Sequence, residues 1–268
     1  MISISVAIIT FNEEKNISRC IDSVKDIADE IVVIDSYSTD KTKLICLSKG
    51  ARFIEHRFEG FTAQKNFAVK QANHDFILAL DADEYLSPEL TQSILYAKSD
   101  GSADGYKMNR LNSYAGKWVK SCGWYPDTKI RLWNRQKGSW QGGLVHEVVV
   151  MNNNSKVRKL KGDLLHLAYE NASQLITKMQ QHYADLFARE NANKKVVTTF
   201  QIGYKTIASF LKSYILKRGI FDGYEGLLIS VSNANGVFYK YAKLLEKNRV
   251  LKESEVKGRL KQDTTSRH

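Results

Sequence analysis

The chain has 268 residues, 43% of them hydrophobic, which suits one large α/β domain or a catalytic domain with a helical extension. Its three cysteines are far apart and form no Cys-x-x-Cys pair, which argues against a disulfide framework or a zinc site and favours a reducing compartment. No apolar stretch reaches the roughly 20 residues of a membrane-spanning helix, and residues 2–10 lack the basic start of a signal peptide. We therefore expect a cytoplasmic protein.

The first 80 residues alternate between strand and helix patterns. Apolar runs predict strands over residues 4–9, 30–34, 52–54 and 75–80. Helical patterns occupy residues 13–27, a segment capped by Asp40 that runs to Ser48, and residues 61–72. This alternation predicts an α/β fold with a mostly parallel sheet flanked by helices.

Beyond residue 100 the pattern changes. Strand patterns at residues 106–111, 129–133, 145–150 and 164–167 predict a mixed region that completes a catalytic domain over residues 1–170. Apolar stripes at helical spacing then predict a helical extension over residues 171–252, facing a membrane or a second subunit, followed by a polar tail over residues 253–268.

The net charge of +11 is concentrated in that C-terminal part. Residues 171–268 contain 17 Lys and Arg against 8 Asp and Glu, a charge of +9. The basic residues flank two of the apolar stripes, one through Phe210, Leu211, Tyr214 and Ile215 and one through Phe238 and Tyr241. The pattern is typical of helices lying on an anionic membrane surface, although packing on the α/β domain or a dimer interface would explain the apolar residues equally well.

Polar clusters follow three of the predicted strands, at residues 10–14, 35–40 and 81–84. Ligands of a parallel α/β sheet bind outside the carboxyl ends of its strands. Asp81 and Asp83 come directly after a strand and are spaced i, i+2, so their oxygens can meet on one hard cation such as Mg²⁺ or Mn²⁺. We predict a divalent metal site there.

These clusters also resemble a known family. Residues 5–14 read Ser-Val-Ala-Ile-Ile-Thr-Phe-Asn-Glu-Glu, residues 33–42 read Val-Ile-Asp-Ser-x-Ser-Thr-Asp-x-Thr, and residues 80–84 read Leu-Asp-Ala-Asp-Glu. They are similar to glycosyltransferase family 2, which has the GT-A fold. Later motifs resemble the bacterial subgroup of lipopolysaccharide-core glucosyltransferases: Gln64-Lys65-Asn66, Gly123-Trp124-Tyr125-Pro126-Asp127, Arg131-Leu132-Trp133, Val145-His146-Glu147 and Leu165-His166.

The resemblance implies roles for individual residues. Those expected to bind the nucleotide or its sugar are Thr10, Asn12, Glu14, Asp35, Lys65 and Asp81. Asp83, with Asp81 and His166, is implied as a metal ligand, and Glu147 as the catalytic base of an inverting reaction. Trp124 is attractive as an acceptor contact because aromatic rings pack on sugar faces, although core packing is the commoner use of tryptophan.

The sequence departs from the family pattern at two places. Ser36-Tyr37 replaces the middle of the usual second-loop motif, which affects the expected base contacts, and His146-Glu147 replaces the usual Glu-Asp catalytic pair. The function implied is a metal-dependent inverting transfer of a sugar, with a UDP-sugar as the expected donor. The expected acceptor is a saccharide or lipid-linked glycan of the cell envelope, reached from the inner face of the cytoplasmic membrane.

Two other functions stay open. A sugar nucleotidyltransferase also pairs strand-end acids with a metal, but its N-terminal loop usually contains glycine, and residues 10–14 contain none. A basic nucleic-acid-binding module would explain the C-terminal charge but not three acidic strand ends, which repel phosphate, so we expect no nucleic-acid partner. A dehydrogenase would need Gly-x-Gly-x-x-Gly after the first strand, and the motif is absent.

Overall fold

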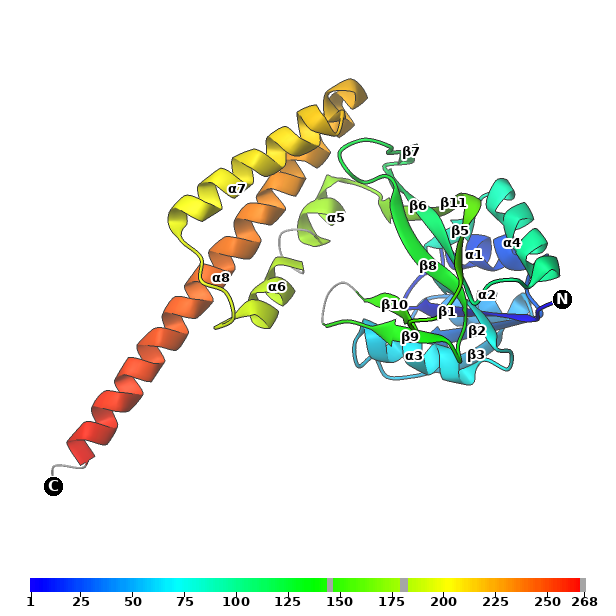
Figure 1. Ribbon diagram of the computed structural model, residues 1–268, viewed down its shortest axis with the longest axis horizontal. Coiled ribbons are helices and arrows are strands. Elements are labelled where there is room, and N and C mark those ends of the chain that lie inside the picture. Colours follow the sequence, from blue (N-terminus) through cyan, green and yellow to red (C-terminus); the bar gives the residue numbers. More distant parts are fainter. Residues whose placement is uncertain (144–146, 179–182, 266–268) are drawn as a thin grey trace. The chain divides into compact units, whose positions relative to one another are not determined.

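A computed structural model describes the chain apart from residues 144–146, 179–182 and 266–268, with side chains described up to residue 254 (Figure 1). The chain forms two compact units. Unit 1 comprises Met1–Lys120 and Trp124–Glu170, and unit 2 comprises Ser121–Gly123 and Asn171–His268. No helix in the described part of the chain has the length and apolarity needed to cross a bilayer.

The parallel half of unit 1 matches the predicted alternation. Its strands β1 (Ile4–Thr10), β2 (Glu30–Asp35), β3 (Arg52–Glu55) and β4 (Phe76–Asp81) lie in the order β3-β2-β1-β4, all parallel. The connecting helices are α1 (Ile17–Val24), α2 (Thr42–Ser48) and α3 (Phe61–Gln71). Side chains of β1 alternate between two apolar clusters, with Val6 in the cluster that holds Ile21 and Ala7 in the one that holds Ala68. The sheet is therefore buried on both faces, and the predicted α/β class is confirmed.

The second half of the sheet is antiparallel where it joins the first. Strand β8 (Asp127–Asn134) runs antiparallel to β4, and β6 (Gly105–Tyr114) runs antiparallel to β8. Strand β11 (Val157–Tyr169) then pairs parallel with β6, and the short β5 (Glu84–Leu86) pairs antiparallel with β11. The remaining strands are β7 (Lys117–Trp118) beside β6 and the hairpin of β9 (Gly138–Gln141) with β10 (Val148–Met151).

Two helices differ from the sequence expectation. Helix α1 begins at Ile17 rather than at residue 13. Residues 13–16 belong to the preceding loop, where the Glu13 side chain accepts a hydrogen bond from Asn16. Helix α4 (Pro88–Asp100) was not predicted, although Ser87 caps its first turn and Gly101 ends it in the left-handed conformation. It packs against β11 at Gly162, where an added Cβ would lie 2.3 Å from the Leu90 amide nitrogen.

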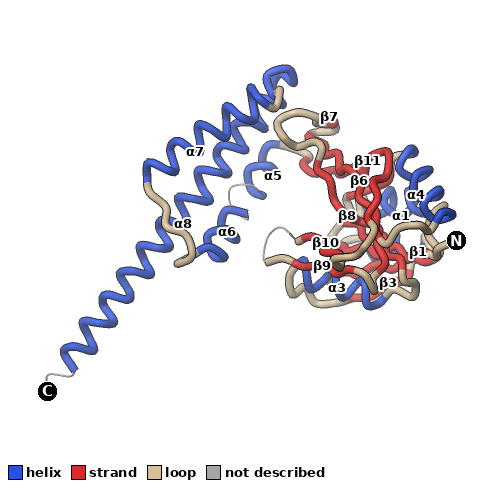
Figure 2. The backbone as a smooth tube through the Cα atoms, in the orientation of Figure 1, coloured by secondary structure: helices blue, strands red, loops and turns tan. Residues whose placement is uncertain are grey.

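Unit 2 is helical (Figure 2). Its elements are α5 (Ala172–Ile176), α6 (Tyr183–Asn191), α7 (Thr199–Leu211), the π-helix η2 (Lys212–Leu216), the 3₁₀-helix η3 (Gly219–Asp222) and α8 (Gly223–Thr265). Helices α6 and α7 both pack along α8, and α8 runs on through the residues that the sequence assigns to a polar tail. A small core of Ala188, Val197, Ile202 and Leu244 joins the three helices.

Ser121–Gly123 belong to the helical unit although they lie between β7 and β8 in sequence. Cys122 is buried there: its amide donates to the Lys217 carbonyl at 2.8 Å, and its own carbonyl accepts from Ser213 at 3.2 Å and Asn233 at 3.3 Å. All three cysteines of the chain are buried and free. The polypeptide therefore passes between the two units three times.

Candidate active site

The loops that follow β1 and β2 hold each other in place. The Asn12 amide donates to the Ser38 hydroxyl at 2.8 Å, and the Asn12 side-chain oxygen accepts from the Thr39 amide at 2.8 Å. Asp35, which is buried, accepts hydrogen bonds from the amide and hydroxyl of Ser38. Asn12 and Asp35 were both predicted to contact the nucleotide. In the structure most of their polar atoms form hydrogen bonds that hold the two loops together.

Further contacts extend this bracing. The Glu14 carboxylate accepts from the Lys41 amide at 3.0 Å, and Asp40 accepts from the amides of Glu14 and Thr42, each at 3.0 Å. Asp40 thus binds the amide of the first residue of α2, but the N-cap is Lys41 rather than Asp40 as the sequence predicted. The Thr10 hydroxyl differs from these groups, because it is buried and has no hydrogen-bond partner in the described part of the chain.

Asp83 lies beside His166 because of strand pairing. Strand β11 runs antiparallel to β5 with His166 opposite Glu84, and the Leu167 amide donates to the Asp83 carbonyl at 3.0 Å. This register places His166 Nε2 3.3 Å from Asp83 Oδ2. Two of the three predicted metal ligands, Asp83 and His166, are therefore neighbours in the fold although they lie far apart in the chain.

The ring orientation of His166 suits metal binding. His166 Nδ1 lies 2.7 Å from Asn112 Oδ1, while the amide nitrogen of Asn112 points to the Trp124 carbonyl at 3.5 Å. An amide oxygen only accepts, so a proton on Nδ1 would be bound by Asn112, and in that tautomer Nε2 presents its lone pair to Asp83. A cation could then be bound by both groups.

Asp81 is engaged by cations of the protein. Its Oδ1 lies 3.1 Å from Lys65 Nζ and its Oδ2 lies 3.3 Å from Arg131 Nη2. Lys65 Nζ donates a hydrogen bond to Oδ2 at 3.4 Å, whereas its closer approach to Oδ1 is not aligned as one, so buried Oδ1 has no hydrogen-bond donor among the described residues. Burial alone would raise the pKa of Asp81, but Lys65 and Arg131 together hold that pKa well below its usual range.

Lys65 also reaches the predicted base. Its side chain is buried, and Nζ lies 2.9 Å from Glu147 Oε1. Trp140 packs its ring 4.7 Å from the same ammonium and 5.5 Å from the Arg131 guanidinium. One lysine therefore bridges Asp81 and Glu147, while His146, the other residue of that motif, lies outside the described residues.

Behind Asp81 lies a buried ionic network that sequence reasoning missed. Arg131 Nη2 lies 2.8 Å from Glu84 Oε1, and Arg110 connects the same carboxylate, at 3.4 Å, to Asp127, at 2.8 Å. Burial lowers the pKa of Arg110 and Arg131, but the carboxylates around them raise it by more, so both stay charged. Glu84 and Arg131 both belong to family motifs named above, and this was the only hint in the sequence that they matter. A motif does not show which of its residues form ion pairs.

Removing the charge of Glu84 should destabilise the fold. We expect Glu84→Gln to lower the free energy of unfolding by about 3–5 kcal/mol, because it leaves buried Arg131 without its closest carboxylate. Urea denaturation measures the change. The matched control is Glu89→Gln, on the exposed first turn of α4, which should cost less than about 1 kcal/mol. Equal urea midpoints for the two variants would show that the Glu84–Arg131 ion pair does not stabilise the fold as expected.

The tryptophans divide between core and surface. Trp133 is fully buried and packs edge-on against Trp140, at 5.8 Å between ring centroids. Trp124 is only partly buried, and its ring lies 5.5 Å from that of Tyr169. Trp124 thus remains available for an acceptor, whereas Trp133 serves the core.

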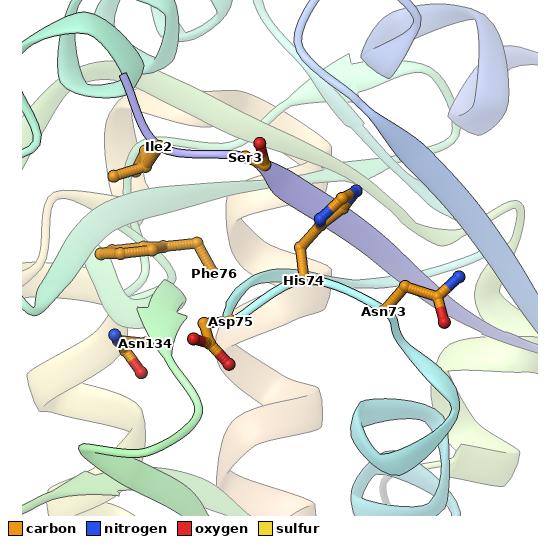
Figure 3. A pocket seen from close by; sticks show the side chains of 7 residues that line it. All are labelled: Ile2, Ser3, Asn73, His74, Asp75, Phe76 and Asn134. Carbon is orange, nitrogen blue, oxygen red and sulfur yellow. The ribbon is translucent and has the colours of Figure 1, made fainter.

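A pocket lies at the amino ends of the parallel strands, away from the carboxyl ends that carry the predicted site (Figure 3). It is lined by residues at the starts of β1 and β4 and the end of β8: Ile2, Ser3, Asn73, His74, Asp75, Phe76 and Asn134. Since ligands of such sheets bind at the carboxyl ends of the strands, this pocket is not where the predicted site lies.

Comparison with known families decides the class of the protein. The sequence model described as Glycosyl transferase family 2 matches residues 5–150, more than half of the chain. The chain belongs to glycosyltransferase family 2. It is therefore a glycosyltransferase, and the matched region includes the loops after β1, β2 and β4 together with Glu147.

Relatives of similar length support the assignment. An uncharacterised glycosyltransferase of Rickettsia typhi is 34% identical over 262 residues, which cover 92% of this chain and 88% of the relative. The lipopolysaccharide core biosynthesis glycosyltransferase LpsC of Rhizobium meliloti is 29% identical over 91% of this chain and 93% of its own length. The family resemblance read from the motifs is thus confirmed, and a lipopolysaccharide core biosynthesis glycosyltransferase is among the similar proteins.

Likeness to solved structures is weaker. Glucosyl-3-phosphoglycerate synthase from Mycobacterium tuberculosis, crystallised with Mn²⁺, UDP and phosphoglyceric acid, is 24% identical with a TM-score of 0.35 over 43% of this chain and 44% of that chain. S. aureus TarS 1–349 is 15% identical with a TM-score of 0.44 over 96% of this chain and 92% of that chain. At these scores the likeness adds nothing to the family assignment.

Proposed function

We propose that this family 2 glycosyltransferase is metal-dependent and inverting, and that it moves a sugar from a nucleotide-sugar donor, with a UDP-sugar as first choice, to a saccharide or lipid-linked acceptor. One observation carries the proposal. At the carboxyl edge of the sheet, a buried ammonium from Lys65 lies 3.1 Å from Asp81 and 2.9 Å from Glu147, next to a facing Asp83–His166 pair. A cation site, a fixed positive charge and a carboxylate that can take a proton are the groups that this transfer requires.

The ligands proposed for the metal are Asp83 and His166, with Asp81 as a third. Among the described residues no group of three or more His, Cys, Asp and Glu side chains is arranged to hold an ion by itself. The Asp83–His166 pair still suits Mg²⁺ or Mn²⁺, which complete their shells with water and phosphate oxygens. Asp81 Oδ1, which receives no hydrogen bond from the described residues, is the proposed further contact once an ion is bound. When bound, the metal offsets negative charge on the departing diphosphate.

Lys65 and Arg131 supply fixed positive charge to the same edge. Both side chains are almost fully buried, so their charges act where water screens them little. Charge that grows on the leaving diphosphate would be stabilised by such preorganised cations, which is often the largest single contribution to catalysis. Lys65 has a second role in this proposal, because its contact with Glu147 orients that carboxylate.

Glu147 is the proposed base. The acceptor hydroxyl gives its proton to the Glu147 carboxylate as its oxygen bonds to the anomeric carbon, and the bond from that carbon to the diphosphate oxygen breaks. Attack opposite the leaving group inverts the anomeric centre without a covalent intermediate. Trp124 is proposed to pack on a ring of the acceptor.

The nucleotide is proposed to lie over the loops after β1 and β2. The unpartnered Thr10 hydroxyl supports this placement, because a buried donor of this kind is costly unless a ligand satisfies it. Asn12, Glu14 and Asp35 would act mainly by holding the loop shape, with their remaining lone pairs available to the base and ribose.

Similarity to LpsC supports an acceptor of the lipopolysaccharide-core type, in assembly of a cell-envelope glycan. An acceptor anchored in lipid would be met at the inner face of the cytoplasmic membrane. Nothing in the described site favours the nucleotidyltransferase alternative, which would release pyrophosphate from a nucleoside triphosphate.

A thermal-shift panel tests the proposed function. The purified chain is heated with UDP-, GDP- and dTDP-sugars, each with and without Mn²⁺, and with UTP as the comparison. A donor present at 100 times its Kd should stabilise the fold by about 2.7 kcal/mol, and only in the presence of the metal. Stabilisation by UTP and sugar phosphate, with pyrophosphate as product, would instead establish a nucleotidyltransferase.

A further inference from the structure

Large apolar side chains stand exposed where α7 turns into α8. Leu216 is 75% exposed, Phe221 82% and Tyr224 65%, with Ile215 and Ile220 about half exposed beside them. We call residues 212–224 the hairpin tip; it lies at the upper end of the two helices in Figure 1. Single exposed apolar residues are ordinary, but a contiguous group of this size marks an interaction surface.

The tip is held rigidly in this exposed form. Ser213, at its base, is buried and hydrogen-bonds the Cys122 carbonyl at 3.2 Å and Ser230 at 3.0 Å. Gly219 packs so closely on α8 that a Cβ added to Gly226 would lie 1.8 Å from its carbonyl oxygen. These contacts anchor the backbone of the tip to the rest of unit 2, while its large apolar side chains stay exposed.

An apolar stripe of α7 leads up to the tip. Its members recur every three or four residues and are all exposed: Phe200, Tyr204, Ile207, Leu211 and Ile215. Ile202, on another side of the same helix, is buried in the small core of unit 2. The helix therefore shows its larger apolar face to the outside.

The second predicted membrane stripe, through Phe238 and Tyr241, lies on α8 and differs in its surroundings. Tyr241 packs edge-on against Phe187 at 5.5 Å between ring centroids, and Leu244 is fully buried. That stripe is therefore divided, because Tyr241 packs within unit 2 while Phe238 is 42% exposed. The larger exposed fractions belong to the α7 stripe and the hairpin tip.

Charge indicates what covers this surface. Lys212, Lys217 and Arg218 are exposed within the tip, and among the described residues the structure records no ion pair for any of them. A second copy docked face to face would bring two sets of these cations together, which like-charge repulsion disfavours. An anionic bilayer offers both complements at once, phosphate headgroups for the cations and acyl chains for the apolar residues.

We propose that the hairpin tip seats in the headgroup region of an anionic lipid bilayer, with Leu216, Phe221 and Tyr224 reaching the acyl boundary and Lys212, Lys217 and Arg218 on lipid phosphates. The aromatic side chains are of the kind enriched at this depth of a membrane. Binding of this kind is reversible, since no residue of the tip spans the bilayer. It requires neither donor nor metal, so it stands or fails independently of the proposed reaction.

Vesicle flotation tests the proposal on the full chain. Vesicles of phosphatidylglycerol should recover the protein at low salt, whereas vesicles of phosphatidylcholine alone should not. Raising the salt to several times 0.1 M, where the Debye length is about 10 Å, should release much of it. A parent protein that fails to float with phosphatidylglycerol, or that floats equally with phosphatidylcholine, would overturn the proposal.

Two sets of variants separate the contributions. Lys212→Gln, Lys217→Gln and Arg218→Gln together should weaken partitioning on the order of a hundredfold, as expected for three basic residues near an anionic surface. Their matched control is Lys107→Gln, Lys159→Gln and Lys161→Gln, the same charge change on exposed positions of unit 1, which should leave partitioning within about twofold. If both triple variants lose affinity alike, attraction is a general effect of net charge and the tip is not the docking site.

The contribution of the apolar side chains to membrane binding is tested by a second variant and its matched control. Leu216→Ser with Phe221→Ser should weaken partitioning by at least about tenfold, whereas Leu44→Ser with Leu47→Ser, at exposed positions of α2, should not. All substituted side chains are exposed, so circular dichroism melting curves should coincide with that of the parent. Sedimentation closes the test: a parent dimer that the tip variant converts to a monomer would assign the surface to a second copy and refute bilayer docking.

Discussion

Asp83→Ala is expected to lower sugar transfer by at least about 10³-fold, measured as release of the nucleoside diphosphate with saturating donor and acceptor. Asp83 Oδ2 faces His166 Nε2 at 3.3 Å, and the substitution removes the carboxylate of that pair. Without it the departing diphosphate loses the cation that would balance its charge. Excess chelator should lower the activity of the parent enzyme in the same way, and added Mn²⁺ should restore it.

Two controls accompany that measurement. Asp83→Asn keeps the size of the side chain but not its charge, so it should fail as Asp83→Ala does. Asp26→Ala removes an exposed carboxylate elsewhere in unit 1 and should leave transfer unchanged. Full activity of the parent in excess chelator would show that the reaction needs no divalent metal and would remove the metal site from the proposal.

Glu147→Gln should reduce kcat by about 10²-fold or more while leaving the KM for the donor nearly unchanged. The amide fills the same space and can still accept a hydrogen bond from Lys65, which lies 2.9 Å from Glu147 and 3.1 Å from Asp81. What it loses is the ability to take a proton from the acceptor hydroxyl. Single-turnover measurements with saturating donor isolate that step.

Asp127 is the alternative base, and Asp127→Asn is the comparison. Its carboxylate lies 2.8 Å from Arg110 and 3.1 Å from Lys129. Burial would raise the pKa of Asp127, but these two cations lower it, which weakens Asp127 as a proton acceptor. If Glu147→Gln removes donor binding but spares turnover at saturation, Glu147 belongs to the donor pocket and another group is the base.

The parallel half of the fold was accessible to sequence reasoning because its signals are local. The apolar run of β1 ends at Thr10 and that of β4 at Asp81, and each is followed by polar residues, so strand ends and loops could be assigned from the pattern alone. Strand β5, with three residues, is too short to show a period, and its partner β11 lies some 80 positions away. Pairing over that distance leaves no trace in a window of ten or fifteen residues.

The same distinction explains what was found of the site. Asp81 and Asp83 were located by their position after a strand, while the neighbourhood of Asp83 and His166 depends on the β5–β11 register. His166 was identified as a candidate ligand by its resemblance to the family, because hydrophobic periodicity gives no indication of a metal ligand. The bridge that Lys65 makes between Asp81 and Glu147, and the Arg131–Glu84 pair behind it, arise from side-chain directions on α3, β4 and β8, which only the folded chain defines.

The placement of Ser121–Gly123 in the helical unit bears on how the protein can be divided. A gene shortened after codon 170 would encode all of the family motifs, yet the Cys122 carbonyl would lose Ser213 and Asn233, and the Cys122 amide would lose the Lys217 carbonyl. The adjoining Gly123-Trp124 stretch would then be tethered on one side alone. We therefore expect residues 1–170 on their own to be less stable than the same residues in the whole chain.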